Sequence, residues 1–364
     1  MKTSKKLLLV LAAVLTLAGC KSTKSLLPSV SGKAGEVIVV MEKADWEDTL
    51  GSDVRDLLAC DCPWLAQKEP LYTLVNVIPS AFGDLFKYHR NIVLFQVNPQ
   101  LDTTGVIFRH DVWAAPQCAI QINAPDTAAA SEILKEKGPM IVSALEQAER
   151  DRVIRNTLRY EEPALYPQLA DIFGGAPHFP TGYKLRKASD TFAWIADDKQ
   201  AYQDVFIYRY PAEDDPFTME KILAHRNAML QENVPGMFDG TYMTTSDFFP
   251  TTLEFLKYRG RDFAQVRGMW EVQNDFMGGP FVSHSFYSPD GSEILVAEAW
   301  VYAPKFDKRQ YLRQVESLLY SWEWKKPAEE EENATNSFVK SKNFSIFAVP
   351  IWRIALWDEF GGFV

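Results

Sequence analysis

The sequence has few of the residues from which metal centres and nucleophilic sites are built. It contains only four cysteines and five histidines in 364 residues, and no histidine has a second one at metal-ligand spacing. It also lacks the Gly-x-Ser-x-Gly, His-Glu-x-x-His, phosphate-loop and dinucleotide-binding motifs. These absences exclude the enzyme classes that such motifs mark. We therefore expect no cofactor and no metal, and an enzymatic activity is less favoured than a binding role.

Long apolar runs and basic blocks are missing as well. The formal net charge is −10 and no cluster of lysine or arginine interrupts it, which argues against a nucleic-acid partner. No segment after the first twenty residues has 18 uncharged apolar residues in succession, so no membrane-spanning helix is expected. With 47% hydrophobic and 13% aromatic residues, the chain is expected to be globular.

The N-terminus has the pattern of a secretory signal. Three lysines precede an apolar stretch over residues 7–17, which is too short for a bilayer-spanning helix. The run Leu-Ala-Gly-Cys at residues 17–20 resembles the lipobox of bacterial lipoproteins. That resemblance implies removal of a signal peptide over 1–19 and acylation of the sulfur of Cys20.

The residues after Cys20 predict where the protein is anchored. Residues 20–34 are polar and short-chained, which is typical of a flexible tether. Position 21 is Lys and not Asp, and no acidic run follows, which by resemblance favours the periplasmic side of the outer membrane. The expected partners are the membrane, through the lipid, and an envelope protein or glycan.

Three cysteines remain besides Cys20. Cys60 and Cys62 are one residue apart, so a bond between them would close a strained ring, and the spacing is not that of a zinc or redox pair. A disulfide from Cys118 to one of this pair is one interpretation. Three reduced thiols packed as small hydrophobes are the other.

The apolar periodicity predicts an α+β fold in two tandem units, over 35–160 and 161–325. Each unit is expected to be a largely antiparallel sheet with packed helices, because hairpin turns such as Pro289-Asp290-Gly291 dominate the second half. The two halves share an order of elements and the phrases Leu85–Tyr88 and Phe255–Tyr258. Duplication of one unit and coincidence both explain this. The long helix predicted over 126–158 is expected to split or kink at Gly138-Pro139.

The C-terminus, over 326–364, joins an acidic linker to an aromatic and apolar tail. The tail contains Pro350, Arg353 and two acidic residues and is too interrupted to span a membrane. We expect it to pack back on the fold, with docking to a partner or a membrane surface as the alternative. A Ser-x-x-Lys match at Ser337–Lys340 stands beside the acidic linker without its partner motifs, and we interpret it as chance.

Few side chains are candidates for catalysis. His110 and His284 are the candidates considered for a catalytic role. On a strand, His110 and Asp111 would point to opposite faces and could not act together. Structural roles are favoured for both histidines. The acidic pairs at 197–198 and 214–215 are interpreted as solvated turn residues. Most of the ten tryptophans fit core positions, whereas Trp64 and Trp113 near loops are unexplained.

One resemblance extends over residues 1–325. The lipobox, the run Pro79–Asn91 (PSAFGDLFKYHRN) and the phrase Gly182–Lys187 (GYKLRK) resemble an uncharacterised lipoprotein family of the Bacteroidota envelope, known only as a domain of unknown function. The resemblance brings no activity and no catalytic residue. The favoured hypothesis is a lipid-anchored binding or scaffolding module. The alternative is a hydrolase of envelope polymers whose site is not visible as a motif.

The lipid anchor makes a direct prediction. Cys20→Ala removes the acylated sulfur, so the protein should no longer partition with membranes when cells are fractionated and blotted. A Cys60→Ala variant, which keeps the lipobox, should fractionate as the unmutated protein does. A Cys20→Ala protein that stays uncleaved and membrane-bound at normal levels would disprove the lipoprotein assignment.

Overall fold

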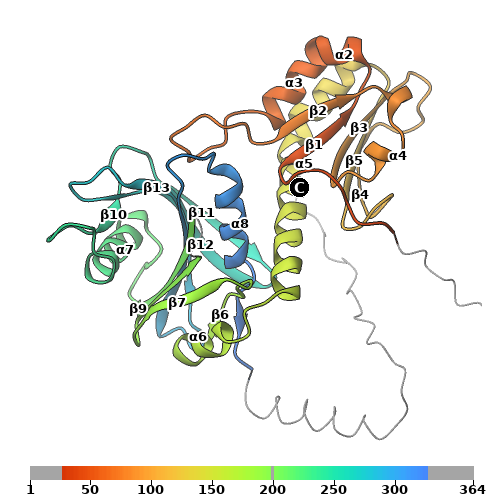
Figure 1. Cartoon of the computed structure of the whole chain (residues 1–364). Helices are drawn as coiled ribbons and strands as arrows, with labels where there is room; N and C mark the ends of the chain where they lie inside the picture. Colours follow the sequence, from red (N-terminus) through yellow and green to blue (C-terminus); the bar gives the residue numbers. More distant parts are fainter. Residues whose placement is uncertain (1–26, 198–200, 327–364) are drawn as a thin grey trace, which may run out of the picture. The chain divides into compact units, whose positions relative to one another are not determined.

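The structure is a computed structural model that describes residues 27–197 and 201–326 (Figure 1). The predicted signal peptide with Cys20, and the predicted tail after Lys326 with its Ser-x-x-Lys match, lie outside the described residues. The described residues up to Glu323 form one compact unit, and a second unit begins at Trp324. Within the described part of the chain, none of the helices combines the length and apolar character that crossing a bilayer requires.

The first sheet is built from the N-terminal third of the chain. Its strand order is β2-β1-β3-β5-β4, and every neighbouring pair is parallel except the antiparallel pair β4–β5. The strands are β1 (Glu36–Val40), β2 (Thr73–Val77), β3 (Asn91–Val97), β4 (Gly105–His110) and β5 (Cys118–Ala124).

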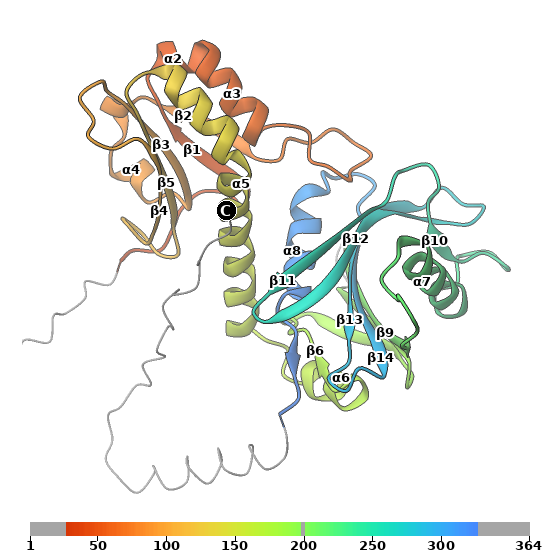
Figure 2. The same ribbon diagram turned by 180° about the vertical axis from the view of Figure 1, so that it is seen from behind.

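Helices cover both faces of this sheet. Helices α3 (Thr49–Leu58) and α5 (Thr127–Arg159) pack on one face, and the short α4 (Asp84–Lys87) follows the 3₁₀ turn η1 (Pro79–Ala81) on the other (Figures 1 and 2). In β1 the alternation of the pleat sends Val37 and Val39 to the α3 and α5 side and Ile38 to the opposite side. Burial on both faces explains why β1 is a continuous β-branched run.

The expected antiparallel pairing is wrong for this first sheet. The chain leaves β1 through α2 (Lys43–Glu47) and α3 and returns in β2, and such a crossover joins parallel strands where a hairpin would join antiparallel ones. Helices α2 and α3 are separated at Asp48, whose backbone is extended. Helix α5, in contrast, is not split at Gly138-Pro139. At Gly138 a Cβ atom would lie 2.8 Å from Leu57 Cδ1, so glycine lets α3 and α5 pack closely there.

The second sheet is antiparallel throughout, as the sequence predicts. Its order is β10-β12-β13-β14-β9-β8-β7, and β11 also pairs with β12. The strands are β7 (Tyr183–Ala188), β8 (Phe192–Asp197), β9 (Tyr202–Pro211), β10 (Met243–Thr245), β11 (Thr252–Tyr258), β12 (Arg261–Val272), β13 (Gly278–Tyr287) and β14 (Glu293–Tyr302). The α+β fold class is therefore correct.

Two helices pack on opposite faces of the second sheet (Figures 1 and 2). Helix α7 (Met219–Asn233) covers an aromatic core that includes Phe206, Phe281 and Trp300. Helix α8 (Arg309–Leu319) packs on β14, β9 and β13 and also contacts α5. A shorter helix and two small strands complete the described elements: α6 (Leu165–Phe173), β6 (Gly175–Ala176) and β15 (Glu323–Trp324).

The two halves are not copies of one unit. Their strand orders differ, and one sheet is mainly parallel where the other is antiparallel. The phrase Leu85–Tyr88 belongs to helix α4 and its C-cap, whereas the matching phrase Phe255–Tyr258 lies in strand β11. Short phrases adopt the conformation that their surroundings favour, so the shared residues were coincidence.

The predicted hairpin turn is confirmed between β13 and β14. Gly291 has φ +74°, and its N–H donates to the carbonyl of Ser288 at 2.9 Å. The Asp290 carboxylate accepts from Ser288 Oγ at 2.6 Å and from Ser292 N at 3.2 Å. These hydrogen bonds favour the ionised form and lower the pKa of Asp290 to about 2.

One ion pair crosses the core of the second sheet. Arg226 of α7 and Glu298 of β14 are both fully buried, and the guanidinium donates to the two carboxylate oxygens at 2.8 and 2.7 Å. The guanidinium also donates to Thr245 Oγ1 at 2.8 Å and lies 3.7 Å above the Phe281 ring. A buried charge with this set of partners is satisfied, whereas either partner alone would be costly.

Arg226→Met should therefore lower the free energy of unfolding by about 3–5 kcal/mol, because it leaves the Glu298 carboxylate buried without a counter-charge. Urea unfolding followed by circular dichroism measures this loss. The double variant Arg226→Met/Glu298→Met should recover most of the stability, since it removes both charges. A double variant as unstable as the single one would show that the pair acts through packing alone.

Candidate functional site

Helix α5 carries acids and then bases along its second half. Its N-cap is Asp126, whose carboxylate accepts from Ala129 N at 2.8 Å. Beyond the part that packs on the first sheet, the sequence runs through Glu146, Glu149 and four arginines at 150, 152, 155 and 159. Spacings of three and four residues repeat among these positions, which brings several of them onto one face of the helix.

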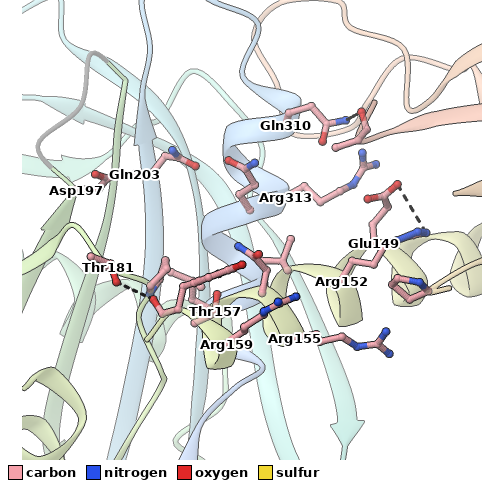
Figure 3. Close-up of a pocket in the computed structure, with 18 of the residues that line it drawn as sticks. Glu149, Arg152, Arg155, Thr157, Arg159, Thr181, Asp197, Gln203, Gln310 and Arg313 are labelled. Carbon is pink, nitrogen blue, oxygen red and sulfur yellow. Dashed lines mark hydrogen bonds and ion pairs between the residues drawn. The ribbon is translucent and has the colours of Figure 1, made fainter. Parts of the chain in front are cut away.

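This face lines a cavity of about 640 Å³ (Figure 3). Its walls are formed by α5, by α8 and by residues at Val30–Ala34, Pro180–Tyr183, Asp197 and Gln203. The volume lies within the range of roughly 300–1,000 Å³ that is usual for ligand sites. Five arginines line the cavity against two carboxylates, which makes it positive in a chain of net charge −10. The arginines are Arg90, Arg152, Arg155, Arg159 and Arg313.

Glu149 neutralises the inner wall. Its carboxylate is buried and accepts from Asn91 Nδ2 at 2.7 Å and from Gly35 N at 3.2 Å. The Arg90 Nε atom lies 3.8 Å from the same oxygen and Arg152 Nη2 lies 4.0 Å from it. Arg152 also donates from Nη1 to Asn91 Oδ1 at 3.2 Å. These contacts tie α5 to the first residues of β1 and β3.

A second carboxylate ties α5 to α8. Arg313 donates from Nη2 and Nε to Glu146 at 2.6 and 3.1 Å, and the Tyr72 hydroxyl donates to Glu146 at 2.6 Å. Burial alone would raise the pKa of Glu146, but Arg313 and these hydrogen bonds outweigh it and lower that pKa. Burial works against the charge of Arg313 too, yet Glu146 and Tyr72 hold the pKa of its guanidinium above the usual value.

Several polar groups of the cavity have no partner among the residues that the structure describes. Arg155 is exposed, and among the described residues no acceptor or carboxylate pairs with it. The Nη1 atom of Arg313 is buried without a hydrogen-bond acceptor in the described part of the chain. Gln203 is only 6% exposed, and no described residue hydrogen-bonds its side chain. A buried polar group without a partner costs free energy, which applies here to the Nη1 atom of Arg313. Arg155 and Gln203 carry further N–H donors that a ligand in the cavity could meet.

The candidate histidines are not brought into this cavity. His110 is exposed on β4, and His284 is fully buried on β13, where it contacts the Gln265 amide at 3.1 Å and the rings of Phe263 and Tyr320. Burial, with help from nearby arginines, lowers the pKa of His284 well below its usual range. In the described residues neither histidine forms an ion pair with a carboxylate. His89 and His178, in contrast, form hydrogen bonds with carboxylates, those of Glu36 at 2.8 Å and Glu161 at 2.6 Å.

The acidic and aromatic candidates have separate surroundings. Asp197 is buried and lines the cavity, whereas Asp198 lies outside the described residues. Trp64, which has φ +63°, lies under the Arg267 guanidinium at 4.6 Å, and Trp113 packs edge-on against Phe82. The expected core role of the other tryptophans is seen in the contacts of Trp194 and Trp270 with Trp300. The second acidic pair, Asp214-Asp215, lies in the segment before α7.

The three described cysteines are free thiols, and Cys118 is buried in the core of the first sheet while Cys60 is exposed. Burial raises the pKa of Cys62 and of Cys118 to about 11, so both are protonated at neutral pH. The disulfide between Cys118 and one of the other two stays a prediction. No cluster of His, Cys, Asp and Glu suited to a metal occurs among the residues described.

The arginines of the cavity were not singled out from the sequence. A signal was present, because Arg152, Arg155 and Arg159 follow each other at helical spacing in an acidic chain. Arg90 and Arg313 come from distant segments, so no local pattern could join them to α5.

The comparisons with known proteins agree with an uncharacterised family. Residues 30–158 match a family model described as a domain of unknown function (DUF8532), and residues 163–321 match another described as a domain of unknown function (DUF4837). No curated protein matches the chain. The boundary between the two matches falls close to the predicted one at 160–161.

Solved structures resemble the chain only weakly. The Ran-binding protein Mog1p of Saccharomyces cerevisiae is 10% identical over 42% of this chain and 90% of its own, with a TM-score of 0.30. A protein of Bacteroides thetaiotaomicron VPI-5482 is 9% identical over 46% of this chain and 55% of its own, with a TM-score of 0.24. Similarity at this level supports no functional argument.

Asp204, next to Gln203, makes the stability pH-dependent. Burial raises its pKa to about 6, although its carboxylate accepts from Trp194 Nε1 at 2.8 Å and from Asp197 N at 3.2 Å. Between pH 4 and 6.5 the Asp204 carboxyl is ionised in the unfolded chain while it is still largely protonated in the folded protein. The free energy of unfolding therefore decreases as the pH rises through this window. The unfolding free energy of the unmutated protein, minus that of Asp204→Asn, should fall by on the order of 2–3 kcal/mol over this window.

Asp290→Asn is the matched control. The pKa of Asp290 is lowered to about 2, so its contribution to stability is constant from pH 4.5 to 6.5 and is lost only at lower pH. Urea titrations at several pH values measure both differences. A flat difference for Asp204→Asn would contradict the assigned protonation.

Proposed function

We propose that this chain is a binding module, anchored through a lipid on Cys20 to the outer membrane on its periplasmic side, whose cavity captures an anionic group of an envelope partner. The observation that carries the proposal is the cluster of five arginines around the cavity. The lipid anchor rests on the sequence pattern at residues 1–20, and the Bacteroidota envelope on the resemblance carried by the runs at 79–91 and 182–187.

The charge arrangement supports capture of an anion. The inner arginines are balanced by Glu146 and Glu149, whereas Arg155 and Arg159 at the exposed end of α5 have no carboxylate beside them in the described residues. Arg159 lies 5.3 Å over the Tyr160 ring, which leaves its N–H groups available. Guanidinium groups donate in a planar fork that fits carboxylates and phosphates. A positive cavity in an acidic protein also concentrates anions locally.

The lining is less suited to the alternative, a hydrolase of envelope polymers. The cavity is lined by no histidine, cysteine or serine in the described part of the chain. Glu149 already accepts hydrogen bonds from Asn91 and Gly35, so it is not available as a general base. The hydrolase hypothesis named His110 or His284 beside a carboxylate, and the contacts of these two histidines do not support it.

The proposal is tested by charge reversal on α5. Arg155→Glu/Arg159→Glu changes the cavity, and Lys135→Glu/Lys137→Glu makes the same change of charge on the same helix outside the cavity lining. Calorimetry of the full chain in detergent measures the binding of three anionic probes: inorganic phosphate, hexaglutamate and trigalacturonic acid. At least one probe should bind to the unmutated protein, more weakly as salt is added.

The first variant should weaken that binding by about tenfold or more, while the lysine variant should retain it. Melting temperatures of both variants should stay near that of the unmutated protein, because all four side chains are exposed. If no anionic probe binds, or if both variants lose binding equally, the cavity is not an anion site.

A further inference from the structure

Gln203 contributes an amide to the wall of the cavity. It belongs to β9, is 6% exposed and has no side-chain hydrogen bond within the described residues (Figure 3). Its amide carries two donor hydrogens and an acceptor oxygen. No described residue hydrogen-bonds this amide, so a ligand that reaches it should offer both a donor and an acceptor.

Other amides surround the same space. Gln310 uses its Nε2 to donate to the carbonyl of Ala34 at 2.8 Å, which leaves its oxygen as an acceptor. Gln314 and Asn156 are exposed, and no side-chain hydrogen bond is formed by either one with the residues that the structure describes. Alcohol groups match these amides, because a hydroxyl donates one hydrogen bond and accepts two. Repeated hydroxyls on a compact body are the signature of a sugar.

The charged side chains of the cavity indicate that the ligand also carries a carboxylate. Arg155 and the Nη1 atom of Arg313 supply N–H donors for one negative group. A ligand with one carboxylate facing the arginines and hydroxyls facing the amides would provide hydrogen-bond partners for both sets of side chains.

The mouth of the cavity has an aromatic surface. Tyr160 follows α5 directly, lines the cavity and is 53% exposed. An exposed aromatic ring of this kind can pack on the apolar face of a sugar ring while its hydroxyl stays in water. Peptides, in contrast, are usually held along a strand edge or in an apolar groove, whereas nine of the 21 lining residues here are arginine or an amide.

We infer that the ligand of this cavity is a carboxylate-bearing saccharide, held by Arg155 and Arg313 at its acid group and by Gln203 at its hydroxyls. The inference rests on the proposed function, because it names the chemical class of the anion that the cavity captures.

The test compares saccharides that differ only at the acid group. Trigalacturonic acid, a hyaluronan tetrasaccharide and sialyllactose are titrated into the full chain by calorimetry, each beside its carboxyl-reduced form. Hexaglutamate and inorganic phosphate are titrated under the same conditions. The variants are Gln203→Met, which keeps the size of the side chain and removes the amide, and Gln231→Met, which makes the same change at an exposed position of α7.

At least one acidic saccharide should bind, and its carboxyl-reduced form should bind about tenfold more weakly or not at all. Gln203→Met should lower the affinity for the saccharide by about tenfold. It should leave any binding of phosphate unchanged, since phosphate needs only the arginines. Gln231→Met should change neither. The melting temperature of Gln203→Met should be equal to or above that of the unmutated protein, because the amide has no partner to lose. If that variant fails to fold, Arg155→Gln serves with the same saccharide pairs.

Three results would overturn the inference. Tighter binding of hexaglutamate than of every saccharide would identify the ligand as an acidic peptide and leave the proposed function in place. Equal binding of the acidic and carboxyl-reduced saccharides would show that the arginines do not bind the acid group. An unchanged affinity in Gln203→Met would show that Gln203 does not bind the hydroxyls. Either result would leave the proposed anion site in place. Failure of all anionic probes, phosphate included, would overturn the proposed function and this inference together.

Discussion

The buried carboxylate of Glu149 is the group on which the arrangement around the cavity depends. A charge in the protein interior is tolerated only with several partners, and Glu149 finds them in Asn91, Gly35 and the arginines at 90 and 152. These partners lie at the beginning of β1 and β3 and on α5 itself, so one carboxylate sets the position of the long helix against the first sheet. Gly35 has φ +70°, a left-handed conformation that favours glycine, and it lies next to the side chain of Gln310 of α8.

One helical turn before Glu149, the carboxylate of Glu146 connects α5 to α8 in the same way, by accepting hydrogen bonds from Arg313. After Glu149 the helix has no further acid on its cavity side, so no carboxylate of α5 offsets the positive charge of the arginines toward its C-terminus. Cations are also favoured at this end by the helix dipole. The cavity is consequently neutral in its depth and positive at its rim, although the whole chain is acidic. Gln203, on the facing strand β9, adds an amide that no described residue hydrogen-bonds.

Much of the local structure could be predicted from patterns of a few residues. Helix α5 begins directly after its Asp126 cap, where the sequence predicts the long helix to start, and the Asp290-Gly291 turn is where the sequence places it. The errors concern relations between segments. The direction of strand pairing in the first sheet depends on where α2 and α3 return the chain, and a shared four-residue phrase is helical in one half and extended in the other. The residues of the cavity were missed for the same reason: Arg313 is 167 positions away in the sequence from Glu146, the carboxylate of α5 that it contacts.

The sequence by itself determined the α+β class, the positions of most strands and helices, the hairpin turn and the absence of common catalytic motifs. These follow from backbone preferences and apolar periodicity, which act over a few neighbouring residues. Only the tertiary structure decided that the first sheet is mainly parallel, that His284 is buried away from any site, and which arginines share one cavity. Those outcomes depend on burial and charge pairing between distant segments, and the partners of a side chain such as Arg313 exist only once the chain has folded.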